Sequence, residues 1–457
     1  MSEIYWRTIL GRVERFAAHY KGPLFHALLT DPPYHLTTIT ERFGKPDSAP
    51  QKHGKDGRFA RLAKGFMGQE WDGGDIAFRP DTWAAFADLL YPGGFGIAFS
   101  SSRTVHRMAV AIEDAGLIIH PMLFGWCYSS GFPKATGLEH RLEDEELAAA
   151  WSGHRYGTQA LKPALEPIII FQKPYDGRPI DNMLANGAGA LNIDAGRIGS
   201  GVESGASGRW PANFYLVHSP GCRVVGHTQG DQYAINRFTD GAKPFGGGAG
   251  HKYEGHEVSL NVPVWECVEN CPATLLDTQS GKLNGDEGGA SRFFHQAGWA
   301  YEIEENLLHV DSIAYISKAS KAERDGGVED YEGPEIHNRF DTCGKCGGTL
   351  LQNPDRPSAC KCEEPERVPN KVTGNFHPTV KPIALTRWLA SLLLPPARYA
   401  PRRIFIPFAG VASEMVGAFQ AGWDIIVGVE ATASYMPLNR KRMRYWMERG
   451  HQLDLFK

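Results

Sequence analysis

The sequence lacks the features of a membrane or secreted protein. None of its 457 residues falls in an apolar run of about 18 positions, the length that a membrane-spanning helix needs. The first residues, MSEIYWRTILGRVERF, carry scattered charges and no apolar centre, unlike a secretory signal peptide. We therefore expect a chain that contacts no membrane and stays in a reducing cytoplasm, where disulfides are rare.

The sequence also lacks an excess of one charge. It has 48 Lys+Arg against 52 Asp+Glu, a formal net charge of −4, and a pI of about 6.5. Proteins that coat nucleic acid usually have a high pI, so any contact with DNA must use a local basic patch. The candidates for this patch are Lys318, Lys321, Arg324, Arg402, Arg403, Arg440, Lys441, Arg442 and Arg444.

The composition is otherwise that of a folded protein. With 42% hydrophobic and 22% charged residues, the chain is neither wholly disordered nor a coiled coil. Its length suits two or three domains, or one large core with insertions. The 52 glycines and 30 prolines predict many loops.

Strands and helices alternate in the N-terminal third. The apolar residues 24–30 predict a buried strand that stops at Asp31, because two prolines follow and proline cannot continue a ladder. Further along, the patterns predict a loop at 35–64, helices at 81–91 and 103–115, a turn at 92–94, and strands at 95–99 and 117–126. This alternation favours an α/β sheet with helices on its faces.

The C-terminal part returns to regular structure after an irregular middle. The patterns predict a helix at 383–394, a strand at 403–406, a turn at 407–410, a helix at 413–421 and a strand at 425–429. Before it, residues 331–372 are polar and hold four cysteines, so they are expected to be an insertion. We therefore divide the chain into four segments, 1–150, 151–330, 331–372 and 373–457.

The C-terminal segment has the order of a Rossmann-like nucleotide site: strand, small-residue turn, helix, strand and acid. Ser413 is expected to cap the helix, with Glu414 in its first turn. Glu430 is placed to accept hydrogen bonds from both hydroxyls of a ribose. The turn has no glycine nest for a pyrophosphate, so the expected ligand is a nucleoside without phosphates, such as S-adenosylmethionine. The alternative is an ordinary βαβ unit with a surface glutamate.

The tetrapeptide Asp31-Pro32-Pro33-Tyr34 suits the methylation of an exocyclic amine. Such a nitrogen is a poor nucleophile, because its lone pair is delocalised into the base. Acceptors aimed at its two hydrogens localise the lone pair, and the Asp31 carboxylate and the Pro32 carbonyl can take one each. Tyr34 can stack on a base that has rotated out of the helix. The alternative is a strand-ending turn with a surface acid.

Several sequence blocks in order resemble the β-class of S-adenosylmethionine-dependent DNA amino-methyltransferases. The blocks are LLTDPPY (28–34), KGFMGQEWD (64–72), YPGGFGIAFSSSRTVHRMA (91–109), GWCYSSGFPKA (125–135), ALKPALEPIII (160–170), GALNID (189–194), GRWPAN (208–213), HPTVKPIALTRWL (377–389) and IPFAGVASE (406–414). In this family the catalytic motif precedes the cofactor motif in the chain, as it does here.

The resemblance implies a fold and a set of site residues. The fold is a Rossmann-like class I methyltransferase with a mostly parallel seven-stranded sheet, interrupted by an irregular, zinc-containing target-recognition insertion. Residues 1–150 are then the catalytic half, 151–330 the target-recognition region that rejoins the sheet near its end, 331–372 a zinc knuckle and 373–457 the cofactor-binding half. The implied catalytic residues are Asp31, Pro32, Pro33 and Tyr34, and the implied cofactor-binding residues are Lys381, Pro382, Pro407, Phe408, Ala409, Gly410 and Glu430.

This sequence departs from the family pattern at three places. The turn at 408–412 is called the cofactor turn below. Its third small position is Ala412, where glycine is usual in the family. The preceding strand ends in Ile406-Pro407, where the family usually has Asp-Pro, so the acid that often contacts the cofactor amine is absent. Gly11 is followed by Arg12 instead of the aspartate that often contacts the cofactor adenine, so that contact stays unassigned.

The cysteines predict two structural zinc sites, since four closely spaced thiols suit tetrahedral zinc. Cys343 and Cys346, with Cys360 and Cys362, form the first site. The second site pairs His218 and Cys222 with Cys267 and Cys271, across a gap of 44 residues that the metal would close. For this second set the alternative is buried free thiols, which pack as small hydrophobes.

The sequence therefore predicts an enzyme that methylates the N6 of adenine in double-stranded DNA by base flipping. Cytosine N4 is the close alternative, because the motif DPPY goes most often, but not always, with adenine. A protein or RNA amino-methyltransferase and an inactive zinc-containing DNA-binding protein are further alternatives. The resembled family often forms homodimers and includes bacterial restriction-modification enzymes, but nothing here resembles a nuclease, so a solitary phage or host enzyme is also consistent.

Overall fold

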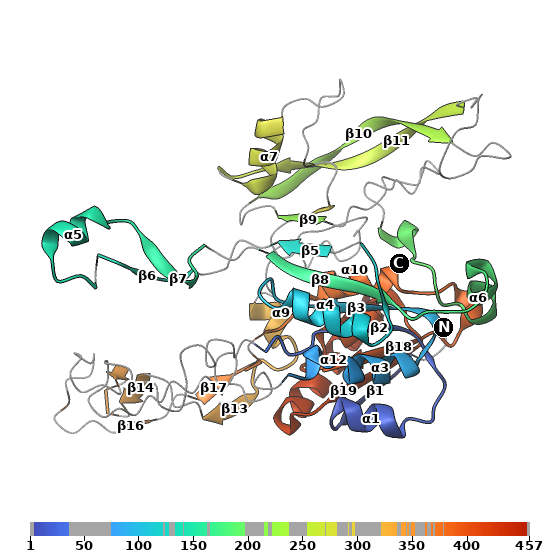
Figure 1. The fold of residues 1–457 in the computed structure, drawn as a ribbon, viewed down its shortest axis with the longest axis horizontal. Coiled ribbons are helices and arrows are strands. Elements are labelled where there is room, and N and C mark those ends of the chain that lie inside the picture. The colour runs from blue at the N-terminus through green and yellow to red at the C-terminus, as the bar shows by residue number, and fades with distance from the viewer. Residues whose placement is uncertain are drawn as a thin grey trace. The chain divides into compact units, whose positions relative to one another are not determined.

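The computed structural model divides the chain into two compact units (Figure 1). Unit 1 contains residues 1–123, 166–191 and 318–457, and unit 2 contains residues 124–165 and 192–317. The structure describes residues 4–35, 75–121, 124–127, 133–139, 141–161, 165–196, 214–217, 222–236, 254–269, 271–280, 291, 295–297, 321–335, 340–343, 345–346, 349–351, 362, 367–368, 371–377 and 379–454. The four predicted segments interleave with these units and do not coincide with them.

Seven strands of the described part of unit 1 pair side by side, in the order β1-β19-β18-β2-β3-β8 with β4 also on β8. Their bounds are β1 (Tyr5–Leu10), β2 (Phe25–Thr30), β3 (Leu90–Phe99), β4 (Ile118–Ile119), β8 (Leu165–Gln172), β18 (Arg403–Pro407) and β19 (Ile425–Glu430). The pairs from β1 to β3 are all parallel, and β8 runs antiparallel to both β3 and β4. The mostly parallel α/β sheet expected from the sequence is therefore confirmed.

The strands form where apolar runs are bounded by turn residues. Every residue of β2 is buried, as expected for a parallel strand covered on both faces. Its neighbour β18 is registered with it at Ile404↔Ala27 and Phe405↔Leu28, so that segments almost 380 positions apart pair directly. Parallel neighbours end at the same edge, and this places the loops after β2, β18 and β19 together.

Helices cover both faces of the unit 1 sheet. Side chains of α1 (Val13–His19), α3 (Pro80–Asp88) and α4 (Val105–Asp114) share one buried cluster with Phe405 and Val427. On the other face α11 (Ser413–Ala421) approaches β19 so closely that a Cβ on Gly428 would lie 2.5 Å from the sulfur of Met415. The helices α10 (Ile383–Leu392) and α12 (Met436–Asp454) pack on α11 in turn.

Several elements differ from the sequence prediction. The expected turn at 92–94 is an irregularity inside β3, where the register with β2 shifts, because the extra residues bulge out of the ladder. The strand expected at 117–126 is two strands, β4 and β5 (Phe124–Cys127), which lie in different units. The middle segment, expected to be irregular, contributes the buried strand β8 to the unit 1 sheet. The loop predicted at 35–64 lies, after His35, outside the described residues.

Smaller elements complete unit 1. They are η3 (Ile76–Phe78), α6 (Pro179–Asn186), α9 (Lys321–Asp325), η7 (Ala397–Tyr399), η8 (Ala433–Tyr435) and the short strands β13 (Glu332–Glu335), β14 (Phe340–Cys343), β15 (Thr349–Leu351), β16 (Arg367–Val368) and β17 (Lys371–Thr373). The strands β13–β17 belong to the polar segment that was predicted to be an insertion, and they pair only with one another among the described residues.

The described part of unit 2 contains one long two-stranded ribbon, several short strands and two α-helices. Its elements are β5, β6 (Lys134–Gly137), α5 (Glu145–Ala150), β7 (Arg155–Gln159), η4 (Ile193–Gly196), β9 (Phe214–Val217), β10 (Arg223–Asn236), β11 (Glu254–Glu266), α7 (Pro272–Ser280) and β12 (His295–Ala297). The long antiparallel ribbon of β10 and β11 leads directly into α7. Among the helices that the structure describes in either unit, none is long and apolar enough to cross a membrane.

Candidate active site

Two loops from opposite ends of the chain begin at adjacent strand ends in unit 1. Asp31 follows β2 and the turn at 408–412 follows β18, its parallel neighbour. The Thr30 hydroxyl, the last side chain of β2, donates to the Pro407 carbonyl at 2.7 Å and ties these two ends together. Glu430 ends β19, on the other side of β18. The predicted catalytic and cofactor segments therefore share one edge of the sheet.

Asp31 forms an ion pair with Lys381, 350 positions later in the chain. The Lys381 Nζ donates to the Asp31 Oδ2 at 2.5 Å, and the two side chains are only 4% and 15% exposed. Lys381 immediately precedes Pro382 and α10, so the segment that was expected to bind the cofactor also contacts Asp31. The pairing fixes the Asp31 carboxylate in one orientation.

Tyr34 is held at both of its polar ends. Its hydroxyl donates to the Glu166 Oε2 at 3.2 Å, and its carbonyl accepts from the Thr104 hydroxyl at 3.2 Å. Burial, followed by the charges of Asp31 and Glu166, raises the pKa of the Tyr34 phenol well above its ordinary value. The phenol is therefore neutral at physiological pH and serves as a hydrogen-bond donor.

Glu166 was not assigned a role from the sequence, although it lies in the quoted block ALKPALEPIII. It stands near the start of β8, and its Oε2 lies 3.8 Å from the Lys381 Nζ. Lys381 thus contacts two carboxylates and also lies over the rings of Tyr34 and Phe99, at 5.2 and 5.1 Å from their centroids. Burial acts to lower the pKa of Lys381, but its acidic neighbours outweigh burial and raise the pKa.

The turn after β18 has unusual backbone geometry. Phe408, Gly410 and Ala412 all have positive φ angles of 58°, 46° and 72°. Ala412 is the residue that precedes α11, so the helix begins at Ser413 itself and the predicted capping role of Ser413 is wrong. A left-handed residue at this position turns the chain directly into the helix, which leaves Ser413 inside the first turn.

Glu430 closes the cofactor turn. Its two carboxylate oxygens accept from the backbone N–H groups of Gly410 at 2.8 Å and Thr432 at 2.6 Å. Burial raises the pKa of Glu430, and these backbone N–H groups work in the opposite direction. Each oxygen keeps a second lone pair, so the carboxylate can still accept from a ribose hydroxyl.

His377 lies beside the same turn and was named in the sequence only as part of the block HPTVKPIALTRWL. A Cβ on Gly410 would lie 3.2 Å from its Nε2, so no larger residue fits at Gly410 without a shift. Burial, then the charges of Lys381, Arg442 and Arg324, lowers the pKa of His377 to about 3. The imidazole is therefore neutral next to the turn.

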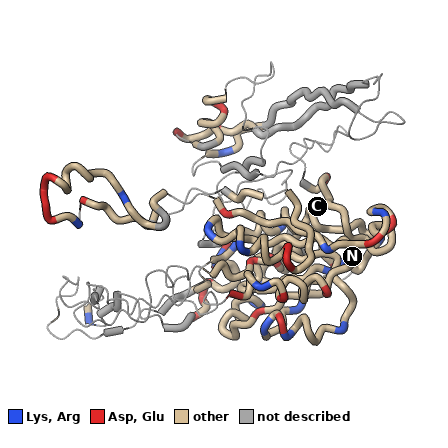
Figure 2. The backbone as a smooth tube through the Cα atoms, in the orientation of Figure 1, with Lys and Arg blue, Asp and Glu red and all other residues tan. Residues whose placement is uncertain are grey.

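The candidate basic patch is reduced by the structure. Arg442 is fully buried and donates to backbone carbonyls, so it cannot contact DNA on the surface. Arg402 is paired with Asp424 at 2.9 Å. Basic and acidic residues are interspersed along the part of unit 1 that Figure 2 shows. Lys318 lies outside the described residues.

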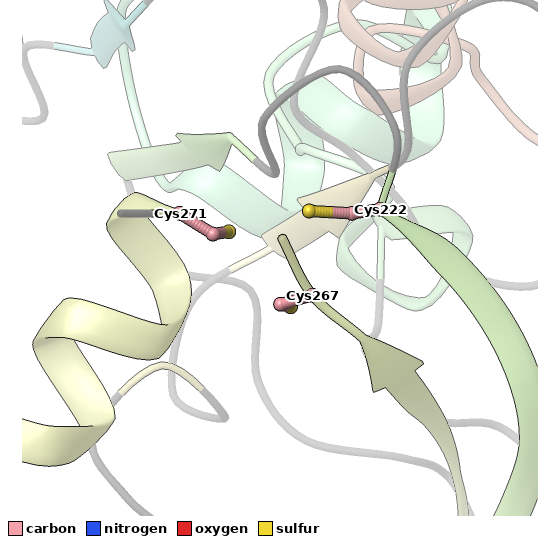
Figure 3. A group of neighbouring side chains, drawn as sticks. All are labelled: Cys222, Cys267 and Cys271. Atoms are coloured by element: carbon pink, nitrogen blue, oxygen red, sulfur yellow. The ribbon is translucent and has the colours of Figure 1, made fainter. Parts of the chain in front are cut away.

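Three of the four residues predicted for the second metal site meet in unit 2. The sulfur atoms of Cys222, Cys267 and Cys271 all lie within 4.8 Å of one another. Cys222 directly precedes β10, Cys267 directly follows β11, and Cys271 directly precedes α7, with the side chains of Cys222 and Cys271 pointing toward one another (Figure 3). Burial is the main cause that raises the pKa of Cys267 to about 12. The fourth residue, His218, lies outside the described residues.

The first predicted metal site stays a prediction. Cys360 lies outside the described residues, and Cys343 is described only through its backbone in β14. Cys346 is exposed and Cys362 is partly buried. The spacing of these four cysteines therefore remains the basis for that site.

Comparison with known proteins gives one sequence relative and several structural neighbours. No family model matches the chain. The Type II methyltransferase M.HindIII of Haemophilus influenzae is 27% identical over 189 residues, which are 36% of this chain and 58% of that protein. The matched part therefore spans less than two thirds of the length of this relative.

The structural neighbours have low scores. The complex of M1.HpyAVI with SAM has a TM-score of 0.36 and 12% identity, covering 96% of this chain and 99% of that one. The PvuII DNA methyltransferase, described as cytosine-N4-specific, has a TM-score of 0.37 and 9% identity, covering 99% and 93%. The DNA modification methylase TTHA0409 of Thermus thermophilus has a TM-score of 0.36 and 11% identity, covering 97% and 95%.

The motifs, their order in the chain and the sequence match to a Type II methyltransferase agree with one another. The resemblance to the S-adenosylmethionine-dependent DNA amino-methyltransferases that the motifs predicted is confirmed by this match.

Proposed function

We propose that this protein transfers a methyl group from S-adenosylmethionine to the N6 of an adenine in double-stranded DNA. One observation carries the proposal: the Asp31 carboxylate, fixed by Lys381 at 2.5 Å, stands at the same sheet edge as the cofactor turn and Glu430. A methyl donor held by the turn therefore lies within reach of an amine held by Asp31. The residues Asp31 to Tyr34 are proposed as catalytic.

Asp31 and Pro32 activate the amine by accepting its two hydrogens. The ion pair with Lys381 holds the Asp31 carboxylate in place, so no reorganisation is needed when the amine arrives. Pro32 and Pro33 are buried, and their rings restrict the direction of the Pro32 carbonyl. The lone pair is then localised on nitrogen, and the surplus proton leaves after methyl transfer.

Tyr34 holds the base. Its ring can stack on an adenine extruded from the duplex, while its hydroxyl stays bonded to Glu166. The contact at Glu166 and the contact of Thr104 with the Tyr34 carbonyl keep the ring from rotating away. The catalytic loop is thus fixed at both ends before the base arrives.

The residues of the cofactor turn fit S-adenosylmethionine, which supplies an electrophilic methyl group on a sulfonium. Pro407, Phe408, Ala409 and Gly410 would hold the nucleoside, because the left-handed backbone at Phe408 and Gly410 exposes the chain to close approach. Glu430 would accept from the ribose, and Lys381 and Pro382 would flank the methionine end. The small residue Ala412 preserves space where glycine is usual.

The product of the reaction tests this proposal. The protein is incubated with unmethylated DNA and S-adenosylmethionine, the DNA is digested to nucleosides, and the products are separated by mass. We expect N6-methyldeoxyadenosine from the natural sequence, and its formation by Asp31→Asn should be about 10³-fold slower. N4-methyldeoxycytidine as the only product would move the same mechanism to cytosine, and the absence of any methylated nucleoside would contradict the proposal.

We further propose that unit 2 holds a structural zinc ion on Cys222, Cys267, Cys271 and His218. Sulfur atoms around tetrahedral zinc lie about 3.8 Å apart, given a zinc–sulfur distance of about 2.3 Å, and the three described sulfurs already lie within 4.8 Å of one another. Cys343, Cys346, Cys360 and Cys362 are proposed for a second zinc ion. Metal analysis of the purified protein tests both sites and should find two zinc ions per chain.

The partner proposed for the enzyme is double-stranded DNA, with unit 2 and the segment 331–372 as its target-recognition region. A homodimer stays a prediction, which light scattering of the purified protein can test.

A further inference from the structure

The candidate active site holds more acid than base. Among the described residues, the carboxylates of Asp31, Glu166 and Glu414 interact with Lys381, the one ammonium group that they share. These side chains are shielded from water, since Lys381 is 4% and Asp31 and Glu166 are each 15% exposed. Buried charge of one sign is costly unless it is neutralised, so this site favours a ligand that brings positive charge.

Glu414 is the carboxylate in this group without a partner of its own. The residue is 4% exposed and lies in the first turn of α11, a helix of nine residues. Within the described part of the chain, the only hydrogen-bond donor to its carboxylate is its own backbone N–H. The Lys381 ammonium bonds to Asp31 instead, so Glu414 has free acceptor capacity inside the site.

The guanidinium of Arg442 forms its hydrogen bonds elsewhere as well. Arg442 is fully buried and donates to the Val411 carbonyl at 2.5 Å, to the Ser413 hydroxyl at 3.4 Å and to the Glu323 carbonyl at 3.2 Å. Burial, and next the charge of Asp31, raises the pKa of Glu414 to about 7, although Lys381 and Arg442 work in the opposite direction. The site therefore lacks about one positive charge.

We propose that Glu414 binds the ammonium group of the methionine part of the cofactor. The proposal rests on the function proposed above. The strand before the turn ends in Ile406 and Pro407, with Ile406 fully buried, so this strand end offers no carboxylate. Glu414 lies one turn further on, beside Lys381 and Asp31, and supplies the acid from the helix instead.

The ammonium suits Glu414 better than the sulfonium does. An ammonium group has three N–H donors, whereas a sulfonium has none. A carboxylate against the sulfonium would also stabilise the donor before the reaction and so slow methyl transfer. Binding at the ammonium anchors the donor without this loss.

Binding of two ligands, one with the ammonium group and one without it, tests whether Glu414 binds this group or only supports the fold. S-adenosylhomocysteine carries the ammonium, and 5′-deoxy-5′-methylthioadenosine shares its nucleoside but lacks the amino-acid part. Calorimetry with both ligands is carried out on the full chain, on Glu414→Gln and on Glu430→Gln. We expect Glu414→Gln to weaken S-adenosylhomocysteine at least tenfold and to change methylthioadenosine less than twofold, whereas Glu430→Gln weakens both.

The natural sequence supplies a second test that needs no variant. Glu414 faces Asp31, Lys381 and Arg442, and its raised pKa means that it gains charge as pH rises through about 7. The preference for S-adenosylhomocysteine over methylthioadenosine should therefore increase about tenfold between pH 6 and pH 8.

Equal weakening of both ligands by Glu414→Gln, or no weakening of either, would overturn the role of Glu414, as would a ligand preference that does not change with pH. Failure of the natural sequence to bind either ligand would instead overturn the proposed function itself. The two failures are therefore distinguishable.

Discussion

The two units are stabilised in different ways. Unit 1 is organised by a large apolar cluster that runs from Val13 to Val429 and includes the fully buried Trp83 and Phe171. Unit 2 has, in its described part, a small cluster whose buried members are Cys222, Cys271 and Ala273. In unit 1 apolar packing stabilises the fold, so the polar side chains at the sheet edge are not needed to hold the unit together. In the described part of unit 2, two of the three buried members of the cluster are thiols, so a metal ion bound there would add directly to the stability of that unit.

This difference explains where buried charge is tolerated. The ion pair of Asp31 and Lys381 stands at the edge of a packed sheet that fixes both partners through β2 and α10. Such a pair contributes little net stability after desolvation, but it orients the carboxylate that we propose to be catalytic. The cysteines of unit 2 have no such support, and a metal ion would supply it.

The largest expected effect is on unit 2. Cys271→Ser should remove one zinc ion per chain and unfold unit 2, because structural zinc contributes about 10–16 kcal/mol of apparent binding free energy. Binding of S-adenosylhomocysteine by unit 1 should persist. Metal analysis and proteolysis of unit 2 measure the outcome, with Cys346→Ser as the comparison, which should remove a zinc ion and leave unit 2 intact. Unchanged zinc content in Cys271→Ser would contradict the proposed site.

The next effect concerns the reaction in unit 1. Asp31→Asn keeps the shape of the side chain but removes its charge, so kcat should fall about 10³-fold, or about 4 kcal/mol. Cofactor affinity should change little. Single-turnover transfer of labelled methyl groups measures the rate, and Asp114→Asn, an exposed aspartate at the end of α4, is the matched control. A fall of less than tenfold would show that Asp31 is not catalytic.

A smaller effect tests the buried charges. Lys381→Met leaves Asp31 and Glu166 without their shared cation, which should lower the free energy of unfolding of unit 1 by about 3 kcal/mol. Denaturant unfolding measures this free energy, with the exposed Lys21→Met as control. A stability equal to that of the control would mean that these charges are solvated and not held by Lys381.

The smallest effect concerns the orientation of Tyr34. Tyr34→Phe removes the hydrogen bond to Glu166 but keeps the ring, so it should weaken DNA binding only a few-fold, consistent with about 1 kcal/mol for one hydrogen bond. Glu166→Gln, which can still accept this bond, should have a smaller effect than Tyr34→Phe. The opposite order in a DNA-binding titration would assign Glu166 a role apart from Tyr34.

The sequence predicted those parts of the site that lie in short, local motifs. Asp31 and Glu430 each follow an apolar run of strand length, and the parallel order of such strands brings their ends together. The contact of Lys381 with Asp31 was not predicted, because it joins positions 350 residues apart through tertiary packing. Glu166 was missed for a related reason, since β8 lies in the middle of the chain, which was predicted to be irregular.

Helix ends and burial were harder to predict. The helix begins at Ser413 as predicted, but the left-handed Ala412 occupies the capping position that was assigned to Ser413. Arg442 was expected on a basic surface, yet it is fully buried. It lies within a run of basic residues in α12, and such a run does not show in the sequence which of its members faces the interior. The meeting of Cys222, Cys267 and Cys271 was predicted from spacing alone, since cysteines that bind a metal occur in close pairs.

The most direct test of the central claim is a competition among acceptors. Labelled S-adenosylmethionine is mixed with the protein and equal amounts of double-stranded DNA, RNA and protein extract, and the label in each fraction is counted. The account predicts label in DNA alone, on an exocyclic amine, with transfer by Asp31→Asn slowed about 10³-fold. Label in RNA or protein, or transfer by Asp31→Asn at an undiminished rate, would contradict it.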